Sequence, residues 1–224
     1  MTAPRVTPQQ AWDELIAGNE RFVSGRSAHP NQDVERRTEL ANSQTPDVAL
    51  FGCADSRMAA EIIFDRGLGD LFIARNMGHV VAESITASME YAVTALGSAL
   101  IVVLAHDSCG AVAAAIDQTS RQPSQVTESV RNTLAPIQPS VQQLWLREQT
   151  DTPYADASRL DANAVGRLHL TATVNELLRS SRAISDAVDA GRLAIVGCQY
   201  RLTEGRAVPY TVVGPVDLEL APIN

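Results

Sequence analysis

Two short polar clusters, Cys53-Ala-Asp-Ser-Arg57 and His106-Asp-Ser-Cys109, carry residue types that bind metals. Each cluster follows an apolar run, and side chains that follow parallel strands meet at one edge of a sheet. Two cysteine thiolates and one imidazole form the Cys₂His set of some catalytic zinc sites, which leaves the fourth tetrahedral position open. Cys109 also stands where a helix would begin, and a helix N-terminus lowers the pKa of a thiol. The pattern predicts a metal site made of Cys53, His106 and Cys109.

Short apolar runs supply the strands that would position these clusters. Four runs are too short for helices and apolar throughout, at residues 48–52, 71–74, 99–105 and 193–197. Such strands are buried on both faces, which is typical of a parallel sheet. Helical patterns lie between and after them, at residues 59–66, 83–96, 111–118, 160–180 and 181–190, with a broken helical region at 123–139. The alternation predicts an α/β domain with a mostly parallel central sheet flanked by helices. A late strand at residues 207–213 contains Pro209, which places it at an edge.

The segment before the first strand has a different character. Thr7, Pro8 and Gln10 form a helix start with a capping box, and an apolar stripe that includes Trp12 and Leu15 follows. A second, polar helix is expected at residues 33–42. We interpret the chain as a single domain, with an N-terminal helical arm at 1–45 and an α/β zinc-binding core at 46–224. Because the arm precedes the αβ pattern, we expect its apolar face to pack on a neighbouring subunit.

Composition narrows the class of protein. The 224 residues are 45% hydrophobic and 20% charged, which excludes a disordered tail, a collagen and a coiled coil. The net charge of -8 argues against a nucleic-acid partner. The longest apolar run has seven residues, whereas a membrane helix needs about 20. With three cysteines and no visible secretory signal, we expect a cytoplasmic protein with reduced thiols and no membrane partner.

The two metal-binding clusters together resemble the signature of the β-class carbonic anhydrases. The similarity extends through residues 51–57, 67–70, 75–76, 90–93, 106–112 and 197–206. It implies one zinc ion per subunit, held by Cys53, His106 and Cys109. It also implies reversible hydration of carbon dioxide to bicarbonate and a proton by attack of zinc-bound hydroxide, since zinc lowers the pKa of bound water to about 7. The resemblance further implies a homodimer or a dimer of dimers, in which the N-terminal helices embrace the neighbour.

Asp55 and Arg57 add a second element to this resemblance. In a closed, inactive state Asp55 would be the fourth zinc ligand. In an open state a bidentate pair with Arg57 would hold Asp55 off the metal, free to accept a hydrogen bond from the hydroxide. The family is known in both arrangements, and we expect the open one at neutral pH. The alternative to both states is that Asp55 and Arg57 form an ordinary structural salt bridge at the start of a helix.

The resemblance also assigns a substrate pocket. Gln44 falls where the family has a glutamine that donates to the substrate oxygen, and Phe72 and Tyr91 match an apolar pocket built partly across the subunit interface. Met77 lies at a pocket position usually held by a smaller residue, and Gly110 would allow close backbone approach. Such a pocket suits a small nonpolar molecule.

Two positions outside the pocket depart from the family pattern. Ala105 stands where the family usually has glycine, so a glycine-only backbone angle there would be strained. Leu50 stands where the bicarbonate-regulated branch has tryptophan, which argues against that branch's noncatalytic bicarbonate site, although Tyr200 matches its tyrosine.

Three other functions remain open from the residues alone. The same motif serves enzymes that hydrolyse carbonyl sulfide or carbon disulfide. A non-catalytic, zinc-stabilised assembly protein is disfavoured, because structural zinc sites close with four Cys or His ligands. A thiol redox module is disfavoured because Cys53 and Cys109 do not have Cys-x-x-Cys spacing. Cys198 is interpreted as a core thiol, His79 as a candidate proton relay near the pocket, and His169 as a solvated or packed helix residue.

Overall fold

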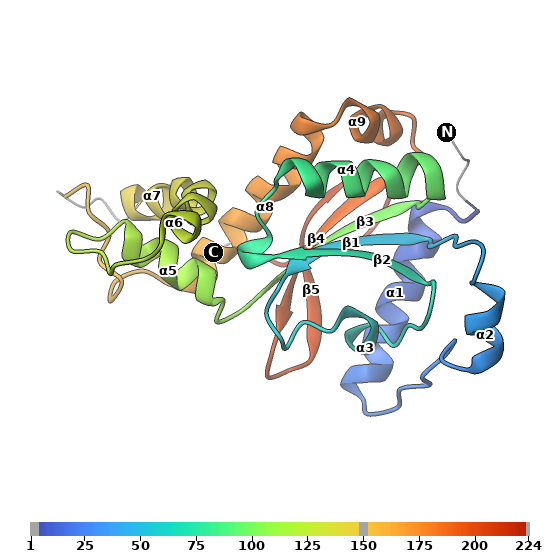
Figure 1. Cartoon of the computed structure of the whole chain (residues 1–224). Coiled ribbons are helices and arrows are strands. Elements are labelled where there is room, and N and C mark those ends of the chain that lie inside the picture. Colours follow the sequence, from blue (N-terminus) through green and yellow to red (C-terminus); the bar gives the residue numbers. More distant parts are fainter. Residues whose placement is uncertain (1–4, 148–151, 223–224) are drawn as a thin grey trace.

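The computed structural model describes residues 5–147 and 152–222, and it contains one five-stranded sheet. The strand order is β2 (Leu71–Asn76), β1 (Val48–Cys53), β3 (Leu100–His106), β4 (Ala194–Arg201) and β5 (Arg206–Val213). All pairs are parallel except β4 with β5, which is antiparallel and lies at an edge. The prediction of a mostly parallel α/β sheet is therefore confirmed (Figure 1).

The register of the parallel strands aligns their carboxyl ends. Cys53 at the end of β1 lies beside Asn76 at the end of β2, and His106 at the end of β3 lies beside Tyr200 in β4. Every residue of β1 and β3 is buried, because helices cover both faces of the sheet. The polar residues that follow these strands thus emerge together at one edge.

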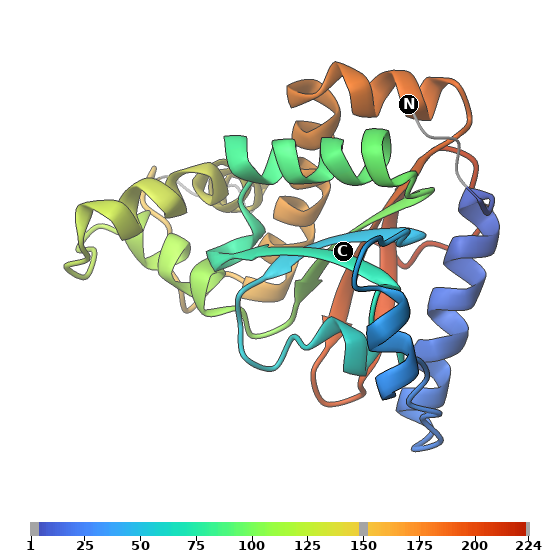
Figure 2. The same ribbon diagram turned by 45° about the vertical axis from the view of Figure 1, so that its right-hand side comes forward.

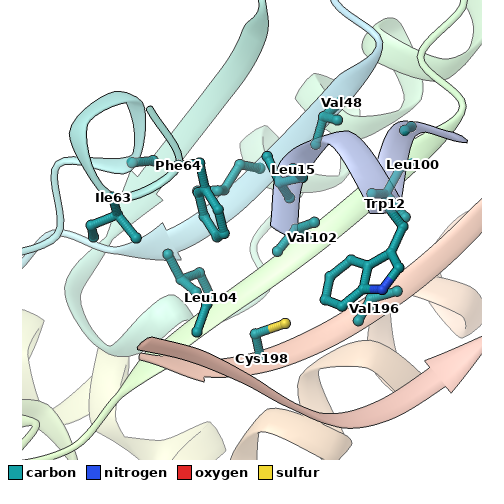
Figure 3. Packing of buried hydrophobic residues seen from close by; sticks show 14 of the residues in the cluster. Trp12, Leu15, Val48, Ile63, Phe64, Leu100, Val102, Leu104, Val196 and Cys198 are labelled. Carbon is teal, nitrogen blue, oxygen red and sulfur yellow. The ribbon is translucent and has the colours of Figure 1, made fainter. Parts of the chain in front are cut away.

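Alternate residues of the strands build two separate hydrophobic layers. Helices α4 (Glu83–Tyr91), α8 (Ala162–Ser180) and α9 (Arg182–Asp189) cover one face, and they share a cluster with Phe51, Ile101 and Val103. Helix α1 (Pro8–Val23) and the single turn α3 (Ala60–Ile63) cover the other face, where Leu50, Val102 and Val196 point (Figures 1 and 3).

The position of α1 corrects one expectation. Its apolar stripe, with Trp12 and Leu15, is buried against the sheet of its own chain, so this helix needs no second subunit to cover it (Figures 2 and 3). The capping box at Thr7 is present. The short helix α2 (Val34–Glu39), in contrast, has no buried residue. The arm therefore divides into a core helix and an exposed segment, while residues 1–4 lie outside the described part of the chain.

A third group of helices extends beyond the carboxyl edge of the sheet (Figure 1). It consists of α5 (Gly110–Gln118), α6 (Glu128–Leu134), the 3₁₀ turn η3 (Ala135–Ile137) and α7 (Gln138–Arg147). The broken helical region expected at 123–139 is therefore more helical than predicted, and α7 continues to Arg147. The buried side chains of these helices form a hydrophobic cluster with Cys53 and Cys109, so an apolar wall lies beside the candidate metal-binding residues.

Two further segments complete the chain between β2 and β3. The 3₁₀ turn η1 (Met77–His79) follows β2 directly, and a π-helical turn (Ala92–Leu96) ends α4. The helix predicted at 59–66 is reduced to α3, because Asp65 adopts a left-handed φ of 46°. Within residues 5–147 and 152–222, no helix is long and apolar enough to cross a membrane.

Candidate metal centre

The three predicted ligands meet at the carboxyl edge of the sheet. Cys53 is the last residue of β1, His106 is the last residue of β3, and Cys109 directly precedes α5. Their ligand atoms all lie within 4.8 Å of one another, and all three residues are buried. Zinc–sulfur bonds of about 2.3 Å and zinc–nitrogen bonds of about 2.0 Å fit within such a group. Two adjacent strands and one helix start therefore converge on a single point.

The hydrogen bonding of His106 leaves one nitrogen available to a metal. Its Nδ1 lies 2.8 Å from the carbonyl oxygen of Asp107, and a carbonyl only accepts, so Nδ1 carries the proton. Its Nε2 is buried and has no hydrogen-bond partner among the described residues. A backbone carbonyl that orients the imidazole in this way is the usual support of a metal-binding histidine.

The thiols of Cys53 and Cys109 interact directly and shift each other's pKa in opposite directions. The Cys109 thiol lowers the pKa of Cys53 to about 4 by donating to its sulfur, and backbone N–H groups of Asp55 and Gly78 act in the same direction. The same interaction, together with burial, raises the pKa of Cys109 above its ordinary value. The expectation of a lowered pKa at Cys109 is therefore reversed without a metal: the N–H groups of α5 do favour its thiolate, but the Cys53 sulfur outweighs them.

The centre as a whole attracts positive charge. Burial alone would lower the pKa of His106, but the neighbouring Cys53 sulfur outweighs it and raises that pKa. A cation bound between Cys53, His106 and Cys109 would satisfy both sulfurs and the unpartnered Nε2 at once. The residues present therefore fit a metal ion of the zinc type.

Asp55 is turned toward Arg57 in a bidentate pair. Arg57 donates from Nε to Oδ1 over 2.8 Å and from Nη2 to Oδ2 over 2.7 Å, and its backbone N–H also donates to Oδ1 over 2.9 Å. These bonds hold the pKa of Asp55 well below its usual range. Oδ2 remains 3.9 Å from Nε2 of His106, close to the centre. Of the two expected arrangements, Asp55 paired with Arg57 or Asp55 as a fourth metal ligand, the structure has the first.

Arg75 fixes the strand end that carries Cys53 and Asp55, a role that the sequence did not reveal. Its Nε donates to the Cys53 carbonyl over 2.8 Å, and its Nη2 donates to the Asp55 carbonyl. Ala54 donates its N–H to the carbonyl of Asn76 over 2.8 Å. The loop after β1 is thereby tied to β2, and nothing in the local sequence indicates these partners.

Two of the predicted pocket residues lie beside the centre. Met77 packs against the cluster that contains Cys53 and Cys109. Gly110 follows Cys109 directly, and a Cβ atom built on it would meet no atom within 4 Å. Open space therefore borders the centre at Gly110.

The other three predicted pocket residues lie elsewhere in this chain. Phe72 pairs in register with Ala49, four residues before Cys53, which corresponds to about 13 Å along the strand. The rings of Phe72 and Tyr91 are 6.1 Å apart. Gln44 and Tyr91 line a separate hollow of about 680 Å³. One chain by itself therefore does not bring Gln44, Phe72 and Tyr91 to the metal centre, because they stand toward the amino ends of the strands.

The two positions outside the pocket that depart from the family pattern, and the third cysteine, all lie in buried parts of the sheet. Ala105 lies in the regular β3–β4 register and is not among the described residues with positive φ, so its methyl group causes no backbone strain. Leu50 and Tyr200 are both buried in the layer beneath α1. Cys198 is fully buried in the same layer, and burial raises the pKa of its thiol.

The two histidines outside the centre are both inside the protein. His79 is 1% exposed, and burial holds its pKa well below the ordinary value. A solvent-facing proton relay at His79 is therefore not what the structure shows. The sequence left His169 either solvated or packed, and the structure shows it packed in the interior. The centre of its ring lies 4.5 Å from that of the His79 ring.

Comparisons with known proteins show which family the chain resembles over most of its length. The family model described as "Carbonic anhydrase" matches residues 48–207. "Carbonic anhydrase 2" of Mycobacterium tuberculosis (strain CDC 1551 / Oshkosh) is 45% identical over 217 residues, which cover 97% of this chain and 100% of the relative. "Carbonic anhydrase" of Mycolicibacterium smegmatis is 44% identical over 204 residues, which cover 91% and 93%. A solved structure described as a tetrameric beta-carbonic anhydrase of Sordaria macrospora is similar in fold, with a TM-score of 0.67 at 23% identity and coverage of 89% and 96%.

Proposed function

Because the chain belongs to the carbonic anhydrase family, we propose that it hydrates carbon dioxide reversibly at a zinc ion held by Cys53, His106 and Cys109. Zinc at such a site supplies a Lewis acid that yields a nucleophile from water near neutral pH. The observation that carries the proposal is the buried Cys–His–Cys group next to an ion-paired Asp55.

Asp55 and Arg57 orient the nucleophile in this proposal. Arg57 engages both carboxylate oxygens of Asp55, so Asp55 stays ionised and acts only as a hydrogen-bond acceptor. Oδ2 is also the oxygen that lies near His106 Nε2. An acceptor in this place would orient the reacting water beside a metal held by Cys53, His106 and Cys109. The same pair disfavours a closed state with Asp55 as a ligand, because closure would break both bonds to Arg57.

The substrate pocket requires a second copy of the chain in this proposal. Met77 and Gly110 border the centre from within the chain, while Gln44, Phe72 and Tyr91 stand about a strand length away. Tyr91 is 51% exposed, which leaves its ring available to a neighbour. We propose a homodimer, or a dimer of dimers, in which these three residues face the neighbour's metal centre. A cytoplasmic location suits the two close thiols, which a reducing compartment keeps unoxidised.

The test combines metal analysis with stopped-flow carbon dioxide hydration. The parent protein is expected to hold one zinc per chain and to be active. Asp55→Ala is expected to keep the metal and lose activity, whereas Cys53→Ala is expected to lose both. Full activity of Asp55→Ala would remove Asp55 from the mechanism. Zinc without turnover between about pH 6 and 9 would support the assembly protein, since a metal-activated water should ionise in that range. Sulfide release from carbonyl sulfide without carbon dioxide hydration would support the alternative hydrolase.

A further inference from the structure

The turn η1 begins immediately after Asn76, which pairs in register with the metal ligand Cys53. Two consecutive residues of this turn, Gly78 and His79, have left-handed φ values of 73° and 42°. A Cβ atom at Gly78 would approach the Cβ of Ala111 to 2.9 Å and Cδ1 of Ile137 to 3.0 Å. The turn is therefore compressed against α5 and η3, and only glycine fits at its centre.

This turn lies against the metal centre. Met77 of this turn packs against the cluster that contains Cys53, and the backbone N–H groups of Gly78 and Asp55 face the Cys53 sulfur, where they lower the pKa of the thiol. N–H donors to a metal-bound sulfur set its orientation and its charge. The direction of the Gly78 N–H consequently depends on what holds the two peptide units of the turn.

Helix α8 holds the other side of the turn. His169 Nε2 lies 2.8 Å from the Gly78 carbonyl oxygen, and Thr173 Oγ1 donates to the His79 carbonyl over 3.4 Å. The side chain of Asn76 closes the turn from within, because its Nδ2 donates to the Val80 carbonyl over 2.7 Å and its Oδ1 accepts from the Val80 N–H over 2.9 Å. The Gly78 carbonyl thus depends on a side chain that lies 91 residues away.

The protonation of His169 suits a permanent donor. A carbonyl only accepts, so Nε2 carries the proton of a neutral ring. His169 is 3% exposed, the ring of His79 packs against its ring, and burial lowers the pKa of His169. His169 therefore remains a neutral donor at neutral pH.

We propose that His169 is a positioning residue of the metal centre, which fixes the Gly78 carbonyl and thereby aims the Gly78 N–H at the Cys53 sulfur. This role rests on the proposed metal site but not on the identity of the substrate. It assigns to the middle of α8 an effect on metal retention, although α8 contributes no ligand to the Cys53–His106–Cys109 group.

The experiment compares three variants of the full chain loaded with cobalt(II), which reports thiolate coordination by its absorption. His169→Leu removes the donor, His169→Gln keeps an N–H at a similar distance, and Val174→Ala weakens the same helix at a residue buried against the sheet. Metal release to an excess of chelator and the thiolate-to-cobalt absorption are measured for each. We expect His169→Leu to release metal about 10-fold faster or more and to change the absorption. We expect His169→Gln to restore both properties and Val174→Ala to leave both near the parent values.

Several results would overturn this role. Parent-like release and absorption in His169→Leu would reduce His169 to a packing residue, and equally fast release from Val174→Ala would indicate general loosening. If His169→Leu does not fold, nitrogen NMR of the parent decides, because a proton on Nδ1 instead of Nε2 contradicts the hydrogen bond. A parent that binds no metal defeats the proposed function and this role together. Metal binding without carbon dioxide hydration defeats only the proposed reaction.

Discussion

Trp12 offers a quantitative test of how the N-terminal helix is placed. Its ring is 5% exposed and belongs to the same buried layer as Val102 and Val196 (Figure 3). Burying an aromatic side chain of this kind removes about 200 Å² from water, worth about 5 kcal/mol at 25 cal/mol per Å². Substitutions of buried tryptophan by alanine typically cost about 3–5 kcal/mol. We therefore expect Trp12→Ala to lower the free energy of unfolding by about 4 kcal/mol.

That loss is a large part of the stability of a typical domain, which is about 5–15 kcal/mol. For a chain of this size it corresponds to a decrease in Tm of about 8–16 °C. The assay is urea unfolding followed by circular dichroism, because the substitution removes one of the two tryptophans that fluorescence would report. Val34→Ala on the exposed helix α2 serves as the control, with an expected change within about 0.5 kcal/mol.

The concentration dependence separates the two placements of α1. If Trp12 packs on its own sheet, the difference between variant and parent stays the same over a wide range of protein concentration. If Trp12 packed on a neighbour, the substitution would act through association, and the difference would grow on dilution. A loss below about 1 kcal/mol, or one that depends strongly on concentration, would refute the intramolecular packing.

Three further predictions concern the thiols, the second subunit and the pH dependence of folding. Removing the metal with a chelator should make Cys53, whose pKa the Cys109 thiol lowers, reactive toward a thiol reagent while the fully buried Cys198 stays inert; rapid labelling of Cys198 in the folded protein would contradict its core position. Asp55→Ala chains and Tyr91→Ala chains, each inactive alone, should regain about a quarter of the parent activity when they are mixed, if Tyr91 faces the neighbour's centre. The reason is that about half of the randomly formed dimers contain both kinds of chain, and each of these dimers has one intact site out of two. No recovery after verified exchange of chains would place Tyr91 within its own chain's site. Burial would raise the pKa of Asp65, but the N–H groups of Ala28 and His29 and the Arg21 guanidinium outweigh it and lower that pKa to about 2. The contribution of the ionised Asp65 to the stability of the fold should therefore be present above about pH 4 and be lost as the pH falls toward 2. Asp65→Asn should flatten this part of the stability profile, and an unchanged profile would show that another carboxylate is responsible.

Much of the metal centre was predictable because its parts are local in sequence. Cys53 ends one apolar strand and His106 ends another, and the parallel register necessarily brings neighbouring strand ends together. The Asp55–Arg57 pair spans only two residues, so its geometry is available as soon as the loop forms. The helix start at Thr7 and the edge position of β5 are equally local and agree with the structure.

Other features depend on contacts between distant residues. An amphipathic helix has an apolar stripe whichever surface it packs against. The stripe of α1 in the sequence therefore could not show whether the helix packs on the sheet of its own chain or on a neighbouring subunit. The helix predicted at 59–66 ended early because Asp65 turns back to bind Arg21 and the N–H groups of Ala28 and His29, all more than 30 residues away.

The sequence by itself predicted the strands and the three candidate ligands, since both follow from local spacing and the geometry of parallel strands, and its resemblance to the β-class carbonic anhydrases predicted the Asp55–Arg57 pair. The tertiary structure alone decided that Gln44, Phe72 and Tyr91 stand away from the metal centre of their own chain. It also decided that His169 reaches the Gly78 carbonyl in the turn η1. The physical reason is that hydrogen-bond partners 91 residues apart share no local pattern, and that only the packing of α8 against η1 brings them within 2.8 Å.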